Sequence, residues 1–206
     1  MPGDDAAVEL QYLGLQCPQL TAECGKTGAR YLREPAHRRR RPAVARRLCV
    51  GNLEIASALI KKALALDPNS AFAWNRSAWL NNYFMRPEVA IEQFQRAIRL
   101  SPFDPMNFNC LFGVGAAHWV AGRHEEALLW IRKGILEHPP MVAISRIIAA
   151  CLVRLGRISE AREVVRQICE DYPTLTTSKV IATVPLCDAD FVRLYVEDLR
   201  KAGLPE

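Results

Sequence analysis

The sequence lacks a long apolar segment, since no stretch reaches the roughly 18 uninterrupted apolar residues that a membrane-spanning helix requires. The most apolar run, MVAISRIIAACLV, is short and contains Arg146. The first ten residues, MPGDDAAVEL, are acidic and show no secretory signal pattern. We therefore expect a cytoplasmic protein that does not span or bind a membrane.

Cysteine motifs are also missing. The chain of 206 residues has seven cysteines, an odd number at wide spacings, and no C-x-x-C pair. A disulfide framework or a structural zinc site needs paired cysteines at short, defined spacings. We expect free thiols, several of them buried as small apolar side chains.

The sequence offers no arrangement typical of a catalytic or cofactor site. Cys110 and His118 are eight residues apart on one expected helix, which is poor spacing for metal ligands. Residues 23–30, ECGKTGAR, lack the first glycine of a phosphate-binding loop, because Gln19 stands in its place. We therefore predict a protein without enzymatic activity, cofactor or metal ion.

What the sequence does contain is a repeat. Four segments each end in proline and carry an alanine twelve positions earlier, with an apolar residue four positions after that alanine. The prolines are separated by 34, 37 and 34 residues. They are Pro68, Pro102, Pro139 and Pro173, and the alanines are Ala56, Ala90, Ala127 and Ala161. Small and apolar residues at this spacing indicate closely packed helices, each with one core-facing stripe.

This pattern resembles the tetratricopeptide repeat, a helix–turn–helix unit of 34 residues. The second unit matches best: Trp74 takes the first aromatic position, Ala90 and Phe94 give A-x-x-x-F, and Ala97 and Pro102 follow. The family prefers Leu, Gly and Tyr at three positions that are held here by Ser77, Ala78 and Asn81.

The resemblance implies an all-α fold, an α-solenoid of helix pairs closed by a C-terminal capping helix. We predict a basic, poorly ordered tail over residues 1–41 and a repeat array over 42–173. The array has an incomplete first unit and further units at about 71–104, 105–139 and 140–173. Capping helices fill 174–206.

Turn and capping residues refine these boundaries. Gly115 fits a close helix contact, and Gly122 and Gly156 fit the turns inside the second and third complete units. We expect Asp104 to cap the helix that follows it, with Pro105 in the first turn. The last helix should begin after Asp188 and end before Gly203.

Tetratricopeptide repeats bind ligands along the inner faces of the first helices, so the resemblance implies a candidate partner-binding groove there. Counting along each unit, we expect its exposed positions to include Asn75, Arg76, Trp79, Asn82, Tyr83, Asn109, Arg146 and Arg154. Arginine and asparagine suit a peptide backbone or carboxylate, and aromatic rings anchor side chains. The set is not the family's carboxylate clamp of lysines and asparagines, and Trp79 could equally pack between units.

The basic residues concentrate at the N-terminus. Residues 1–50 contain nine Lys/Arg and five Asp/Glu, and residues 36–47 hold six arginines. The repeat register places a first helix at 37–50 and a turn at Gly51. Because Pro42 would interrupt that helix, we expect it to shorten to about 42–50, with Pro42 in its first turn and the four-arginine run outside it.

Residues 51–206 further resemble the C-terminal repeat region of certain bacterial proteins, in which the repeats follow a class III adenylate cyclase or winged-helix domain. The resemblance implies a bacterial regulatory interaction module, and our leading hypothesis is a scaffold that binds a peptide or partner domain. Two alternatives stay open. One is nucleic-acid binding through the arginine run, and the other is a truncated remnant of a larger regulator.

Overall fold

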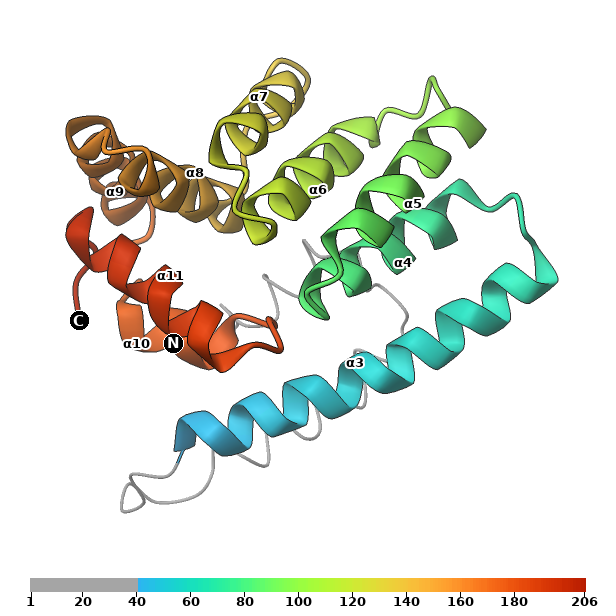
Figure 1. Cartoon of the computed structure of the whole chain (residues 1–206), viewed down its shortest axis with the longest axis horizontal. Coiled ribbons are helices and arrows are strands. Elements are labelled where there is room, and N and C mark those ends of the chain that lie inside the picture. The colour runs from blue at the N-terminus through green and yellow to red at the C-terminus, as the bar shows by residue number, and fades with distance from the viewer. Residues whose placement is uncertain (1–40) are drawn as a thin grey trace. The chain divides into compact units, whose positions relative to one another are not determined.

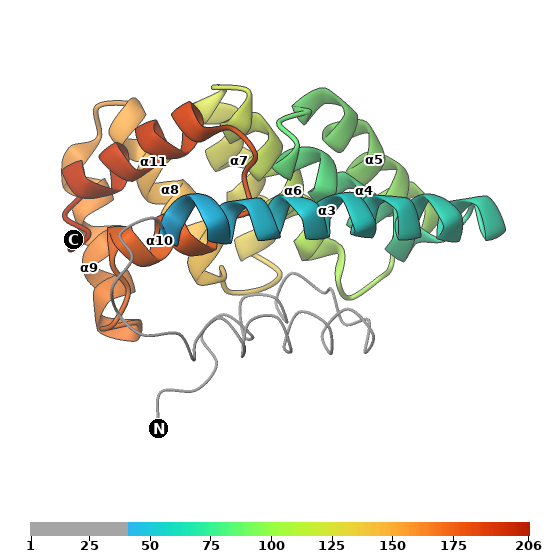
Figure 2. The same cartoon turned by 90° about the horizontal axis from the view of Figure 1, so that it is seen from below.

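A computed structural model describes residues 41–206, with side chains described from Leu53 onward. Every regular element in this part of the chain is a helix, as predicted, and Figures 1 and 2 show them in two views. The helices are α3 (Arg41–Leu66), α4 (Ala71–Tyr83), α5 (Pro87–Leu100), α6 (Asn107–Val120), α7 (His124–Ile135), α8 (Val142–Arg154), α9 (Ile158–Asp171), α10 (Thr177–Thr183) and α11 (Ala189–Lys201).

Helices α4 to α9 form three pairs, α4 with α5, α6 with α7, and α8 with α9, which confirms the α-solenoid. The turns inside the second and third pairs contain Gly122 and Gly156, whose φ angles of 76° and 74° confirm the predicted turn positions. In the first pair the equivalent residue is Met85, with φ 59°. A non-glycine side chain in this left-handed region carries a steric cost.

Close packing in the array depends on three glycines. A Cβ atom on Gly113 of α6 would lie 2.1 Å from Cζ of Phe94 in α5. Gly115, predicted as a close-contact position, meets the Ile131 side chain in the same way, at 2.5 Å. The third glycine, Gly134 of α7, lies against Phe112. These contacts leave no room for a methyl group and fix how neighbouring helices approach.

The prediction for the first unit is wrong in one respect. Instead of turning at Gly51, α3 continues through this residue as one helix of 26 residues. Glycine inside a helix costs only about 1 kcal/mol relative to alanine, so Gly51 by itself does not end α3. Pro42 lies in the first turn of α3, as predicted. The predicted tail falls outside the described residues, except for its last one, Arg41.

The start of α6 also differs from prediction, because this helix begins at Asn107 and not directly after Asp104. The Asp104 carboxylate accepts a hydrogen bond from the Met106 backbone N–H (2.8 Å), so it closes a turn before the helix. Asn107 Nδ2 donates to the backbone oxygens of Ser101 and Pro102, both at 3.0 Å. These hydrogen bonds hold residues 101–106 in place. The 37-residue spacing between Pro102 and Pro139 begins in this connection.

The C-terminal helices follow the predicted capping residues. Asp188 Oδ1 accepts from the Phe191 N–H (2.9 Å) at the start of α11, and Gly203 has φ 100° just past its end. The chain end is held in place, because the Thr177 N–H at the start of α10 donates to the Pro205 oxygen (2.7 Å).

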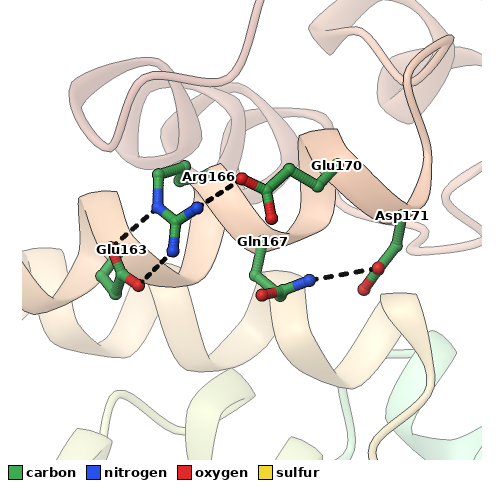
Figure 3. Close-up of polar contacts among 5 residues, drawn as sticks. All are labelled: Glu163, Arg166, Gln167, Glu170 and Asp171. Carbon is green, nitrogen blue, oxygen red and sulfur yellow. Dashed lines mark hydrogen bonds and ion pairs between the residues drawn. The ribbon is translucent and has the colours of Figure 1, made fainter.

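The outward face of α9 is polar. Figure 3 shows Arg166 between Glu163 and Glu170, and Gln167 beside Asp171. Gln167 Nε2 donates a hydrogen bond to Asp171 Oδ1 (3.1 Å). Such pairs, three and four residues apart on an exposed helix, are screened by water and contribute little to stability. They mark this face as one that water covers.

No helix within the described range combines the length and the apolar character that crossing a bilayer requires.

Candidate functional site

The eight residues predicted for the groove lie on three helices, α4, α6 and α8, which are the first helices of the three pairs. We call these helices the first-helix row. In this row α4 contacts α6 and α6 contacts α8, so successive first helices approach one another directly. The fold thus brings the predicted residues onto one continuous layer, as the repeat register implies.

The predicted exposure of these residues is wrong for seven of the eight. Only Arg154 is exposed, and the buried ones are Asn75, Arg76, Trp79, Asn82, Tyr83, Asn109 and Arg146. Two features of the tertiary structure account for part of this burial: side-chain hydrogen bonds between α4 and α6, and a C-terminal segment that folds back over the row.

Four of the predicted residues form hydrogen bonds between α4 and α6. Asn75 Nδ2 donates to Cys110 Sγ (2.9 Å), and Trp79 Nε1 donates to Asn109 Oδ1 (2.8 Å). Asn82 Nδ2 donates to the Gly113 backbone oxygen (2.9 Å). A buried polar group must be hydrogen-bonded, because leaving it unpaired costs about 1–3 kcal/mol. The amides and the indole therefore join two repeat units.

The C-terminal segment crosses the ends of all three first helices. The Cys187 N–H donates to the Tyr83 backbone oxygen at the end of α4 (2.9 Å). Near the end of α6, the Trp119 ring makes edge-to-face contacts with Phe191 and Tyr195, with ring centroids 4.8 Å apart in both pairs. At the end of α8, Arg154 pairs with Asp198.

That last contact is an ion pair with a buried carboxylate. Arg154 Nε lies 2.5 Å from Asp198 Oδ2, and the Asp198 side chain is almost fully buried. Burial raises the pKa of the Asp198 carboxyl above its usual value, and the hydrogen bond from Arg154 opposes this shift. Burial and the nearby Arg154 charge lower the pKa of His124, at the start of α7. A neutral His124 therefore lies close to the ion pair that fastens α11.

Arg76 and Arg146 place two guanidinium groups within the first-helix row, with only 8% and 3% of their surface exposed. Burial lowers the pKa of Arg76, although arginine still remains charged at neutral pH. The Arg76 guanidinium carbon lies 5.0 Å from the centre of the Phe72 ring, which is 64% exposed at the start of α4. A buried cation is thus linked to an accessible aromatic ring.

Sequence reasoning missed the contact of α11 with Trp119. The apolar residues Phe191 and Tyr195 are four apart on one face of the last helix, which predicts that this face is buried. The spacing does not say which surface buries it, because a capping helix could pack on the last pair alone. Only the tertiary structure places it across the first-helix row.

The arrangement contains no candidate metal centre in residues 41–206, where no group of three His, Cys, Asp or Glu side chains is suitably placed. Burial raises the pKa of the Cys110 and Cys151 thiols, the latter to about 12, so neither is a reactive thiolate at neutral pH.

Comparison with known families agrees with this architecture. Residues 45–105 and 83–140 match the tetratricopeptide repeat family, so this part of the chain consists of tetratricopeptide repeats. No curated protein matches the chain. The resemblance to the repeat regions of bacterial cyclases and winged-helix regulators therefore rests on the sequence order alone.

Proposed function

We propose that this protein is an interaction scaffold whose first-helix row binds an acidic, aromatic segment of a partner protein. Tetratricopeptide repeats are generally protein–protein interaction modules, and proteins built from them are typically non-enzymatic scaffolds. The proposal keeps the predicted units, at about 71–104, 105–139 and 140–173, as the binding array.

The observation that carries the proposal is the exposed Phe72 ring at the start of α4 with the Arg76 guanidinium beside it, and Arg146 lies in α8 of the same row. Arginine presents a planar set of donors that fits a carboxylate, and its attraction for an anion is greater where water is excluded. Phe72 adds an exposed ring beside Arg76, so an aromatic side chain of the partner can stack there. An Asp- or Glu-containing segment with an aromatic residue matches both features.

The segment must avoid the ends of the first helices, which the C-terminal segment contacts, and its point of entry is the exposed Phe72 ring. Cys187, Phe191 and Asp198 occupy the C-terminal ends of the first helices. Arg76 and Arg146 lie earlier, in the second turns of α4 and α8. We therefore propose binding over the N-terminal halves of the first helices and withdraw Arg154 from the proposed contact set, because it holds Asp198.

The test uses peptides selected on the purified full chain from a random display library. The enriched peptides should be rich in Asp, Glu and aromatic residues. The double variant Arg76→Gln/Arg146→Gln should weaken their binding by roughly tenfold or more, since each removes a charge-assisted contact. The matched control Arg99→Gln/Arg132→Gln removes two exposed charges from second helices and should leave the affinity unchanged.

Circular dichroism and thermal unfolding must show that both double variants fold. If Arg76→Gln/Arg146→Gln does not fold, Phe72→Ala serves instead, since that ring is exposed and its removal leaves the core intact. Selected peptides without acidic residues, or equal binding by the variants and the wild type, would contradict the proposal.

A second proposal concerns the arginines at 36–47, which lie partly outside the described residues and wholly outside the described side chains. Six arginines in twelve residues could bind a phosphate backbone. In that case, duplex DNA binding should fall steeply with added salt and be lost on deletion of residues 1–42. DNA retention by the deleted protein would exclude this function.

The proposed setting is bacterial signalling or regulation in the cytoplasm, and it is supported only by the order of repeat motifs in residues 51–206. Searching the DNA upstream of the coding sequence for a cyclase or winged-helix domain tests this setting and the possibility of a truncated regulator.

A further inference from the structure

Helix α11 carries the kinds of side chain that the proposed partner segment requires. Phe191 and Tyr195 are aromatic and Asp198 is acidic, and their spacings of four and three residues place all three on one face of the helix. Asp190 and Arg193 lie on another face, where they are exposed and form an ion pair with each other. Residues 188–198 are therefore themselves an acidic, aromatic segment.

The first-helix row binds this face of α11 through the interactions that the proposed function assigns to a partner. Trp119 of α6 contacts both aromatic rings edge-to-face, and Arg154 of α8 pairs with the Asp198 carboxylate at 2.5 Å. An aromatic contact and an arginine–carboxylate pair are the same two interactions that Phe72 and Arg76 offer to a partner. The row thus holds, at the ends of its helices, a segment of the chemistry that we propose it binds.

The docked state of α11 leaves polar atoms unsatisfied. Asp198 Oδ1 and His124 Nδ1 are buried and have no hydrogen-bond partner in the part of the chain that the structure describes. A buried polar atom without a partner opposes docking, because water would hydrogen-bond the same atom in the released state. Phe191 also remains partly exposed, whereas Leu199 near the other end of α11 is fully buried. Release of α11 therefore restores hydration that docking removes.

We propose that α11 is an internal ligand of the first-helix row and limits the access of partner segments to it. In the docked state α11 occupies Trp119 and Arg154, so a partner segment engages the row only from the Phe72 end. When α11 leaves, the same segment extends along the row to Trp119 and Arg154 and binds more tightly. The apparent affinity for the partner is thus reduced by the fraction of molecules in which α11 is docked. This inference rests on the proposed function, because it names a competitor for the same row.

Hydrogen–deuterium exchange of the full wild-type chain tests whether α11 leaves the row. The backbone amides of α11 should exchange at least about tenfold faster than those of α8, because α11 opens locally while the repeat array stays folded. Equal exchange in the two helices would overturn the proposal, since α11 would then open only when the whole array unfolds.

Substitutions on two faces of α11 test the competition. Phe191→Ala/Asp198→Asn weakens docking on the row. The matched control Leu194→Ala/Asp190→Asn removes an apolar side chain and a carboxylate from exposed positions of the same helix. The peptides selected on the wild type should bind the first variant about fivefold more tightly or better, and the control with wild-type affinity. Circular dichroism checks folding, and Asp198→Asn alone, with an expected gain of about twofold or more, replaces a double variant that does not fold.

A synthetic peptide of residues 188–204 separates this inference from the proposed function. Added to the full chain, the peptide should bind Phe191→Ala/Asp198→Asn at least about tenfold more tightly than the wild type, whose own α11 occupies the site at high effective concentration. If this peptide binds the variant but no selected peptide binds the row, the proposed function fails and α11 remains a ligand of the row. If the 188–204 peptide binds neither protein and the selected peptides bind both equally, α11 is not a competitor and the proposed function is unaffected.

Discussion

Helices α3 and α5 occupy the same place in the repeat but are buried to different extents. In α5 the register positions are Ala90, Phe94 and Ala97, all essentially inaccessible to solvent. In α3 the equivalent residues are Ala56, Ile60 and Ala63, of which the first is buried, the second half-buried and the third exposed. The same spacing of small and apolar residues thus produces a packed helix in one unit and a partly uncovered helix in another.

The difference lies in the helices that face each one. Phe94 packs edge-to-face on Trp79 of its own unit, with ring centroids 5.6 Å apart, and fills the space that Gly113 leaves on the next. Ile60 belongs to a unit whose first helix does not form as a separate element, because α3 continues through Gly51. A repeat pattern specifies the shape of one surface, and burial requires a second surface that fits it.

Truncating the equivalent core residues of α5 and α3 should give the largest difference in stability between the two helices. Phe94→Ala should lower the free energy of unfolding by about 3–5 kcal/mol, as expected for a fully buried aromatic side chain. Ile60→Ala should lower it by about 1 kcal/mol or less, since a half-exposed side chain loses less apolar burial. Urea unfolding of both variants measures the two values. Similar losses would show that α3 is packed as tightly as α5.

Filling the space opposite Phe94 tests the close approach of α5 and α6. Gly113→Ala should destabilise the protein by about 1–3 kcal/mol, because its methyl group would overlap the Phe94 ring. A second substitution, Phe94→Leu, should recover part of this loss in the double variant by making room. Chemical denaturation of the two single variants and the double variant gives the coupling. Strictly additive effects would contradict the proposed overlap.

Acidification should weaken the packed units through two histidines. His118 Nδ1 accepts a hydrogen bond from Arg123 Nε (2.9 Å), and burial together with this charge lowers the pKa of His118 below its ordinary 6.5. The pKa of His124 is lowered by burial and by Arg154. In both cases the folded protein favours the neutral ring. The stabilisation is therefore complete above pH 6.5 and is lost as the pH falls below it.

Urea midpoints measured from about pH 7.5 down to about pH 5.5 check this dependence over the range where histidine titrates. The wild type should become less stable toward the acidic end. The variant His118→Gln/His124→Gln should respond less over the same range. An identical response of the two proteins would show that other groups determine the acid sensitivity.

The smallest effect is expected at the turn between α4 and α5. Met85 has φ 59° where the later turns have Gly122 and Gly156. Met85→Gly should raise stability by about 0.5–1 kcal/mol, since glycine adopts this conformation without steric cost. Gly122→Ala should have the opposite sign, and thermal unfolding compares the two. A destabilising Met85→Gly would mean that side-chain contacts of Met85 outweigh its backbone strain.

Much of the fold could be predicted from residue patterns, because repeats rely on local spacing. The alanine and proline periods located the helix pairs, and Gly122 and Gly156 marked turns that only glycine favours. The prediction failed at Gly51 and Asp104, where the outcome depends on contacts outside the local segment. An in-register glycine does not by itself end a helix, and Asp104 closes a turn of its own.

The candidate site was harder to predict than the fold. The register placed Asn75, Asn82 and Asn109 on the first helices correctly, but it could not show that their amides join α4 to α6. Their hydrogen-bond partners are 30 or more residues away in the sequence. The contact of Phe191 with Trp119 spans a still longer separation, so no local pattern could reveal it.

The sequence by itself determined that this protein is a row of helix pairs, because periodic small and apolar residues dictate how successive helices approach. It also determined that the cationic residues of the candidate site, Arg76 and Arg146, lie on the first helices. The tertiary structure alone decided that most of the site is buried and that residues 187–198 cross the ends of the first helices. Burial depends on which distant segments meet, and that choice is made by the packing of the whole array.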